Sequence, residues 1–232
     1  GAVSALNTNL LKNSDFFTSA FPAEYGNATS GVFDIGFRNG NSKKRETTIQ
    51  LGVITGLEAT TEGPINKEKG SSYLVGYRYG LAGVAKLVGV DIGTTATPSY
   101  QDLSFKLNSG TSKLGKFSMF GILATSTINI SGGNSSTLYG NGNEVDFASK
   151  IGIVGFNHFK QINPKSFISS TIGLNYSKTD QTSYDFERPT NVSFIKEVSN
   201  VAKTGYNFST TYNLKVNSKL FIKAGIQDEL MG

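Results

Sequence analysis

Cysteine is absent from the 232-residue sequence. The chain therefore has no disulfide framework, no thiolate metal site and no thiol nucleophile. Proline is also scarce, with 5 residues against 27 glycines, while 11% of the residues are aromatic and 17% are charged. This composition favours many strands joined by turns over a helical bundle or a disordered tail.

Long apolar runs are absent as well. No stretch of about 18 apolar residues occurs, which excludes a helical membrane span, and the N-terminal residues show no secretory signal pattern. The mean hydropathy of -0.19 still allows a membrane protein. A spanning strand needs only about 9–11 residues of alternating polarity, and such strands keep the mean hydropathy low.

Basic residues exceed acidic ones by 22 to 17, which gives a net charge of +5. They are scattered singly except at 43–45, and no face collects them together with aromatic side chains. We therefore expect a solvated surface and no nucleic-acid partner. Neither a cofactor nor a resident metal is predicted.

From about Arg45 onwards, segments of alternating polarity are separated by turns. In Phe167–Tyr184, for example, Ile168, Ile172 and Leu174 alternate with Ser, Thr, Asn and Gly. A soluble sandwich usually carries Lys and Glu on its polar faces. Small hydroxyl and amide side chains instead suit the wide interior of a barrel whose outside contacts lipid.

The alternation predicts nine strands, and the odd number predicts that the chain is one part of a longer barrel. They are expected near Glu46–Ile54, Leu57–Ile65, Ser71–Tyr79, Tyr100–Ser109, Lys116–Ile130, Lys150–Ile162, Phe167–Tyr184, Val201–Asn217 and Leu220–Leu230.

The links between these strands alternate in length, as expected for short periplasmic turns and long outer loops. Short links are predicted at Asn66–Gly70, Gly110–Gly115, Asn163–Ser166 and Asn217–Lys219. Long links are predicted at Gly80–Ser99, Ser131–Ser149 and about Thr182–Asn200, and the short turn at Thr55-Gly56 departs from the scheme.

The N-terminal residues resemble the closing segment of the plug domain in TonB-dependent receptors. The resemblance lies in Asn7–Phe17, in Ala20–Asn27 with its Pro and Tyr-Gly pair, and in the glycine-led strand Gly31–Ile35. Further on, Thr61–Ile65 with Ser72–Arg78, and then Pro98–Leu103, resemble the opening barrel strands of the starch-utilisation-type branch of that family.

The resemblance implies residues 1–40 as the C-terminal part of a plug domain and residues 41–232 as the first strands of a transmembrane barrel of about 22 strands. It implies uptake of a scarce nutrient, a glycan, peptide or metal chelate, across the outer membrane of a Gram-negative bacterium. The implied partners are outer-membrane lipid, a surface lipoprotein, and the TonB complex, which would act through a segment that this chain lacks. No enzymatic activity is expected.

Four residues are candidate ligand contacts. Arg78 falls on the lumen side of its strand by the alternation, together with Lys106 and Lys215, and lumen charges tune what passes. Tyr25 lies in the plug-like Tyr-Gly pair, for which a role in plug opening is the alternative to plain packing. Tyr184 and Asp185 lie in the predicted outer loop around 182–200.

Other motifs have simpler interpretations than the chemistry they suggest. Gly110–Lys116 partly matches a phosphate-binding loop, but Phe117 replaces the magnesium-binding Ser or Thr and a strand follows, so we predict a turn. His158, the only histidine, is predicted to lie on a strand wall. A predicted outer loop carries side-chain oxygens that could bind calcium, but we interpret it as a solvated loop. These oxygens belong to Asn141, Asn143, Glu144 and Asp146.

Two alternative functions stay open from the sequence. The first is a secreted or surface β-sandwich that binds carbohydrate or mediates adhesion, with its apolar faces packed against one another. The second is a β-rich glycoside hydrolase that uses two of the carboxylates Asp180, Asp185 and Glu187 held about 5–10 Å apart. The first predicts a soluble monomer, and the second predicts turnover that is lost in Asp185→Asn.

Overall fold

A computed structural model describes residues 6–18, 25–26, 30–52, 56–80, 96–130, 144–187 and 192–232. In this part of the chain, one short 3-10 helix, η1 (Thr8–Leu10), is accompanied only by strands and their connections. The strands are β1 (Asp15–Phe17), β2 (Val32–Asp34), β3 (Glu46–Gly52), β4 (Gly56–Asn66), β5 (Ser71–Tyr79), β6 (Ala96–Asn108), β7 (Lys116–Ile130), β8 (Glu144–Asn163), β9 (Ser166–Glu187), β10 (Val192–Lys215) and β11 (Phe221–Met231).

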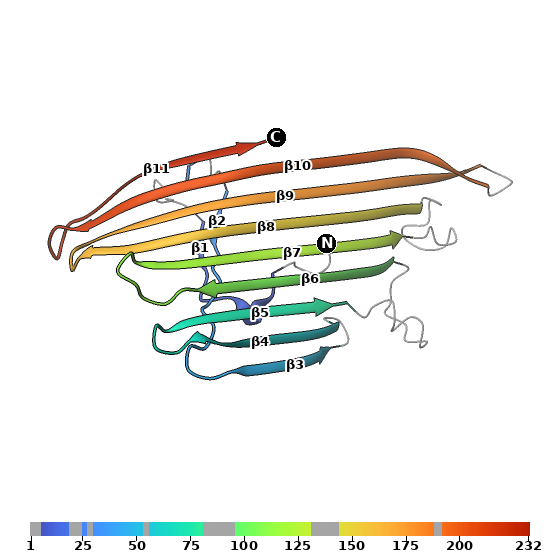
Figure 1. Cartoon of the computed structure of the whole chain (residues 1–232). Coiled ribbons are helices and arrows are strands. Elements are labelled where there is room, and N and C mark those ends of the chain that lie inside the picture. The colour runs from blue at the N-terminus through green and yellow to red at the C-terminus, as the bar shows by residue number, and fades with distance from the viewer. Residues whose placement is uncertain are drawn as a thin grey trace.

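Strands β3 to β11 form one antiparallel sheet in which every strand pairs with its neighbours in sequence (Figure 1). The prediction of an all-β fold with nine successive antiparallel strands is confirmed. From β5 to β10 each strand is longer than the one before it, from 9 residues in β5 to 24 residues in β10. β3 and β11 form the two edges, and within the described ranges neither pairs with a further strand.

The prediction of a long loop at Thr182–Asn200 is wrong. β9 continues to Glu187, β10 begins at Val192, and their pairing is continuous apart from a register shift between Ile195 and Glu197. Hydroxyl and β-branched side chains in this stretch suit an extended backbone although they show no apolar alternation. The predicted link at 131–149 is also shorter, because β8 begins at Glu144.

Tight turns gather at one end of the sheet. In three of them an asparagine side chain closes the turn: Asn66 Oδ1 accepts from Lys69 N at 3.0 Å, Asn163 Oδ1 from Lys165 N at 2.9 Å, and Asn217 Oδ1 from Lys219 N at 2.8 Å. Asparagine is favoured in turns for this reason. The end of β5 and the start of β6, like the end of β7 and the start of β8, lie at the opposite end of the sheet (Figure 1). Thr55 of the predicted exception lies outside the described residues.

The two faces of the sheet differ in polarity. Antiparallel register places one set of large, exposed apolar side chains on a single face, which we call the apolar face. It includes Leu57, Tyr77, Tyr79, Leu107, Met119, Leu123, Phe156, Ile172, Leu174, Tyr176, Tyr206, Ile226 and Leu230. The opposite face, called the polar face, carries mostly Ser, Thr, Asn, Gly and charged side chains, as the alternation predicted.

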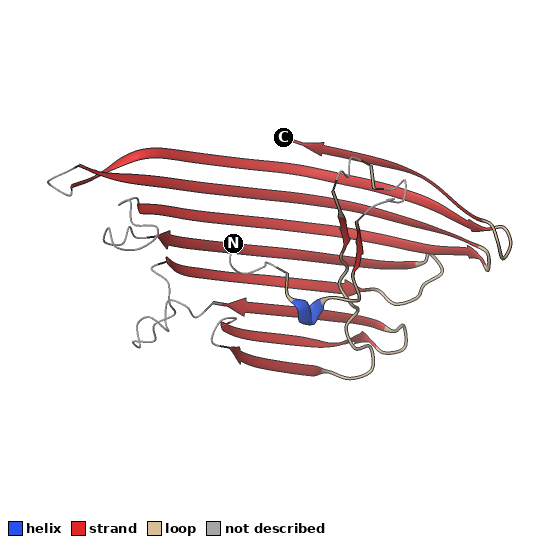
Figure 2. Ribbon diagram, turned by 180° about the vertical axis from the view of Figure 1, so that it is seen from behind, coloured by secondary structure: helices blue, strands red, loops and turns tan. Residues whose placement is uncertain are grey.

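The small hydrophobic core lies on the polar face, not on the apolar one. The buried apolar side chains are Leu10 and Phe37 of the N-terminal segment and Leu74 and Ile122 of the sheet. η1 and the β1–β2 pair lie across this face of the sheet (Figure 2). The described residues therefore leave the apolar face uncovered. The described part of residues 6–40, which we call the N-terminal segment, contacts the polar face through η1 and the residues around Phe37.

Candidate functional site

The contact between the N-terminal segment and strands β3 to β6 is the most strongly built polar region of the described chain. Arg38 donates to both carboxylate oxygens of Glu62 at 2.8 Å each, and Asn41 N donates to Glu62 Oε2 at 2.7 Å. This bidentate geometry is the strong form of an ion pair. The hydrogen bond to Glu62 raises the pKa of the Arg38 guanidinium, which therefore stays charged.

A second carboxylate anchors the start of the segment. Glu58 Oε1 accepts from Asn7 Nδ2 at 2.8 Å and from Asn9 Nδ2 at 2.6 Å. Glu58 is only 8% exposed, so its charge would be costly without these donors. Lys106 makes a third link, from Nζ to Phe37 O at 2.8 Å.

Glycines let the segment approach the sheet closely. A Cβ atom at Gly40 would collide with the Tyr73 backbone carbonyl, and one at Gly76 would lie 2.6 Å from Leu10 Cδ1. Leu10 itself is fully buried beside Leu74. The sequence alternation places Leu74 among polar neighbours, and the packing of Leu10 explains why a leucine stands there.

Arg78, a predicted lumen residue, lies on the polar face within this region. It is 7% exposed, and its Nε donates to Asp102 Oδ2 at 2.9 Å and Oδ1 at 3.2 Å. Asp102 is 2% exposed. Lys106 and Lys215 share the same face by register, as predicted from the alternation.

The other candidate contacts lie elsewhere. Tyr25 donates from its hydroxyl to Asp34 Oδ2 at 3.2 Å, and its ring centroid lies 5.7 Å from that of Phe17. Tyr184 and Asp185 lie on β9 and not in a loop, which corrects their predicted setting. Three strands separate Arg78 on β5 from Asp185 on β9, which corresponds to roughly 19 Å across the sheet. Asp185 also lies eight residues further along β9 than Ser177, the residue level with Arg78, so the two form no common site.

Tyr184 and Asp185 belong to the part of the sheet near the long connections. Tyr184 donates to Asp146 Oδ2 at 3.4 Å, and Asp146 Oδ1 also accepts from Asn129 Nδ2 at 2.6 Å. Asp185 pairs with Lys196 at 3.4 Å. Alternation along β9 directs Tyr184 and Asp185 to opposite faces of the sheet. A ligand on one face could therefore contact only one of the two side chains.

The predicted carboxylate trio is also spread along β9 instead of a loop. Asp180 pairs with Lys178 at 3.0 Å on one face, whereas Asp185 points to the other, so the two do not converge on one substrate. Among the described residues, no group of three or more His, Asp or Glu side chains could hold a metal ion. Asn141 and Asn143 of the calcium-type cluster lie outside those residues.

Two further motifs occupy structural positions. Gly110–Lys116 is a turn, with hydrogen bonds between Ser112 and Gly115 and β7 directly after it, as predicted. His158 lies on β8, where its Nε2 is 2.9 Å from Leu114 O and its ring stacks on Phe117 with centroids 4.6 Å apart. This agrees with the predicted strand-wall histidine.

Sequence reasoning missed the acidic partners of the polar face. On β4, positions 58, 60 and 62 point to the polar face, so Glu58 and Glu62 lie there. Asp102 of β6 lies directly opposite Arg78 of β5 in the register. The sequence does contain a signal for these contacts, because the alternation places the acidic residues on the same side of the strands as Arg78 and Lys106.

The chain matches no protein-family model, no curated protein and no solved structure. No helix in the described part of the chain is long and apolar enough to cross a membrane.

Proposed function

We propose that this chain is part of an outer-membrane transporter of the TonB-dependent class, which imports a scarce nutrient across the membrane of a Gram-negative bacterium. Residues 41–232 form barrel strands and residues 1–40 form the end of a plug. The observation that carries the proposal is the apolar face. Its large side chains are uncovered, for example Leu174 at 61% and Ile226 at 69% exposed. Exposed apolar surface of this extent is expected to be covered by lipid or by another protein.

The length of the apolar stretch along a strand supports lipid as the material that covers this face. On β9 the apolar stretch runs from Ile168 to Tyr176, nine residues, which matches the roughly 9–11 that a spanning strand requires. The remaining residues of the 22-residue strand continue towards the long connections. They carry Lys178, Asp180 and Thr182 on that same face and would project beyond the membrane.

The N-terminal segment supports the plug assignment. It lies on the polar face, held by Arg38, Asn7 and Lys106 through contacts with β4 and β6. In a barrel this face would surround water, and a plug is the element expected inside it. Ligand would meet the polar face and the outer ends of the strands, where Tyr184 and Asp185 lie. TonB and a surface lipoprotein are the proposed partners.

The β-sandwich alternative requires the apolar face to pack against a second apolar layer. The described residues supply none, since β1–β2 and η1 are on the other face. This favours the transporter over the binding module.

Cell fractionation and an uptake screen test the proposal together. We expect the protein in the outer-membrane fraction, dispersed only by detergent. Deleting its gene should abolish energy-dependent uptake of one nutrient among glycans, peptides and metal chelates. A monomer that is soluble without detergent would contradict the membrane assignment. Membrane localisation with unchanged growth on every nutrient would contradict the transport role.

A further inference from the structure

Two lysines of neighbouring strands lie side by side at the end of the apolar face that is nearer the long connections. Lys150 of β8 lies directly opposite Lys178 of β9 in the register. Like charges in this position destabilise a strand pair. Asp180 relieves Lys178 through an ion pair of 3.0 Å. Lys150 is exposed and has no hydrogen bond or ion pair within the described ranges, so no described side chain neutralises its charge.

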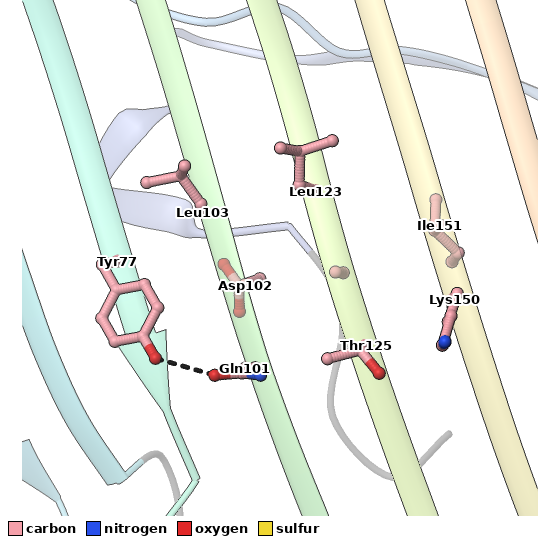
Figure 3. Close-up of a pocket in the computed structure, with 9 residues that line it drawn as sticks. Tyr77, Gln101, Asp102, Leu103, Leu123, Thr125, Lys150 and Ile151 are labelled. Carbon is pink, nitrogen blue, oxygen red and sulfur yellow. Dashed lines mark hydrogen bonds between the residues drawn. The ribbon is translucent and has the colours of Figure 1, made fainter.

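Lys150 continues a row of polar side chains across neighbouring strands. Gln101 of β6 opposes Thr125 of β7, which opposes Lys150. The Tyr77 hydroxyl donates to Gln101 Oε1 at 2.9 Å, which leaves the Gln101 amide nitrogen available as a donor. The three side chains lie next to one another on their strands (Figure 3). An ammonium, a hydroxyl and an amide at about 4.8 Å spacing suit an anion with several acceptor oxygens.

The row forms one side of a groove, and apolar side chains form the other side. A hollow of about 550 Å³ is lined by Tyr77, Leu103 and Leu123 as well as by Lys150 (Figure 3). The next position of the apolar face on β8 is Gly152, where an added Cβ would meet Leu123 Cδ2 only at 3.6 Å. The groove therefore stays open beside the polar row, and the two together match a molecule with an anionic head and an apolar chain.

The row lies where the side chains of the apolar face change from mainly apolar to mainly polar. Towards the long connections the same face carries Thr127, Ala148 and Asp180, and towards the tight turns it carries Leu123 and Tyr176. Tyrosines concentrate at membrane–water interfaces because their rings are apolar and their hydroxyls are polar. In the proposed orientation the row is therefore at the depth of the outer head groups.

We infer that Lys150, with Gln101 and Thr125, binds the phosphate of a phosphorylated lipid of the outer leaflet, and that one of its acyl chains occupies the groove. Lys178 adds a second positive charge, partly neutralised by Asp180. The inference rests on the proposed function, since it needs the apolar face to contact the membrane. It adds a lipid-binding site that is separate from the path of the nutrient.

Titration of the purified 232-residue chain in detergent micelles tests the site. The probes are diphosphoryl lipid A, the same lipid with both phosphates removed, and inorganic phosphate. Lys150→Gln is expected to weaken binding of diphosphoryl lipid A about tenfold, the effect of losing one charge-assisted contact. Dephosphorylated lipid should bind the wild type and Lys150→Gln equally. Gly152→Leu, which places a bulky side chain beside Leu123 of the hollow, should weaken both lipids.

Lys160→Gln is the matched control, because Lys160 lies on the same face of β8 near the tight-turn end. It should change lipid A binding by less than about twofold. Equal losses in Lys150→Gln and Lys160→Gln would overturn the site in favour of unspecific charge attraction. Inorganic phosphate that displaces lipid A at a similar Kd would identify a free-phosphate site and also overturn it. A chain that is a soluble monomer without detergent overturns the proposed function itself, whatever the lipid results.

Discussion

Replacing Asp102 with leucine is expected to lower the free energy of unfolding by about 3 kcal/mol, because it removes the carboxylate that forms an ion pair with the buried Arg78 guanidinium. Arg78 and Asp102 are 7% and 2% exposed, and the Nε–Oδ2 distance is 2.9 Å. Urea unfolding of the chain in lipid vesicles measures the loss. The pair lies on the polar face close to the N-terminal segment, so its loss should also loosen that segment.

A double-mutant cycle separates the ion pair from other effects of the substitution. Arg78→Met, Asp102→Leu and the double variant should give a coupling of more than about 1.5 kcal/mol. The exposed pair of Asp185 and Lys196 is the control, and Asp185→Asn should cost less than about 1 kcal/mol. Coupling near zero at Arg78 and Asp102 would show that the pair contributes nothing specific.

Arginine in place of Ile172 is expected to cost about 2–4 kcal/mol in a bilayer, the penalty for a lipid-facing charge at the midplane. Ile172 is 51% exposed and lies in the middle of the apolar stretch from Ile168 to Tyr176. In water, a substitution at such an exposed position would change stability by about 0.5 kcal/mol or less. The size of the effect therefore reports which phase the apolar face contacts.

Gly173→Arg provides the comparison on the other face. Gly173 is the next residue of β9, and a Cβ atom there would meet nothing within 4 Å. Because its side chain would point into water, the change should alter unfolding in vesicles by less than about 1 kcal/mol. Similar small effects at both positions would argue against contact between lipid and the apolar face.

The strand pattern was predictable from the sequence where one face is apolar. The nine strands and their order follow from period-two alternation and from turn residues such as Asn66 and Asn163, whose side chains close the turns as expected. Position along each strand also predicted that Arg78 and Lys106 share a face. These inferences need only neighbours in sequence and the two-residue repeat of a strand.

The extension of β9 and β10 could not be predicted in the same way. Beyond Tyr176 both faces of β9 become polar, as at Lys178 on one face and Thr179 on the other, so the alternation ends although backbone pairing continues to Glu187. The contacts of the polar face were missed for a different reason. Arg38 with Glu62, and Leu10 with Leu74, join residues that are distant in sequence, and only the packing of the N-terminal segment brings them together.

The absence of tryptophan from the chain permits a direct test of what covers the apolar face. Single tryptophans at Phe208 and at Ser209 place a fluorophore on opposite faces of β10 at the same height. In vesicles, we expect Phe208→Trp to be quenched by phospholipids brominated in the middle of their chains, and Ser209→Trp by acrylamide in water. Equal quenching of both by acrylamide, with none by brominated lipid, would contradict the contact between the apolar face and the membrane.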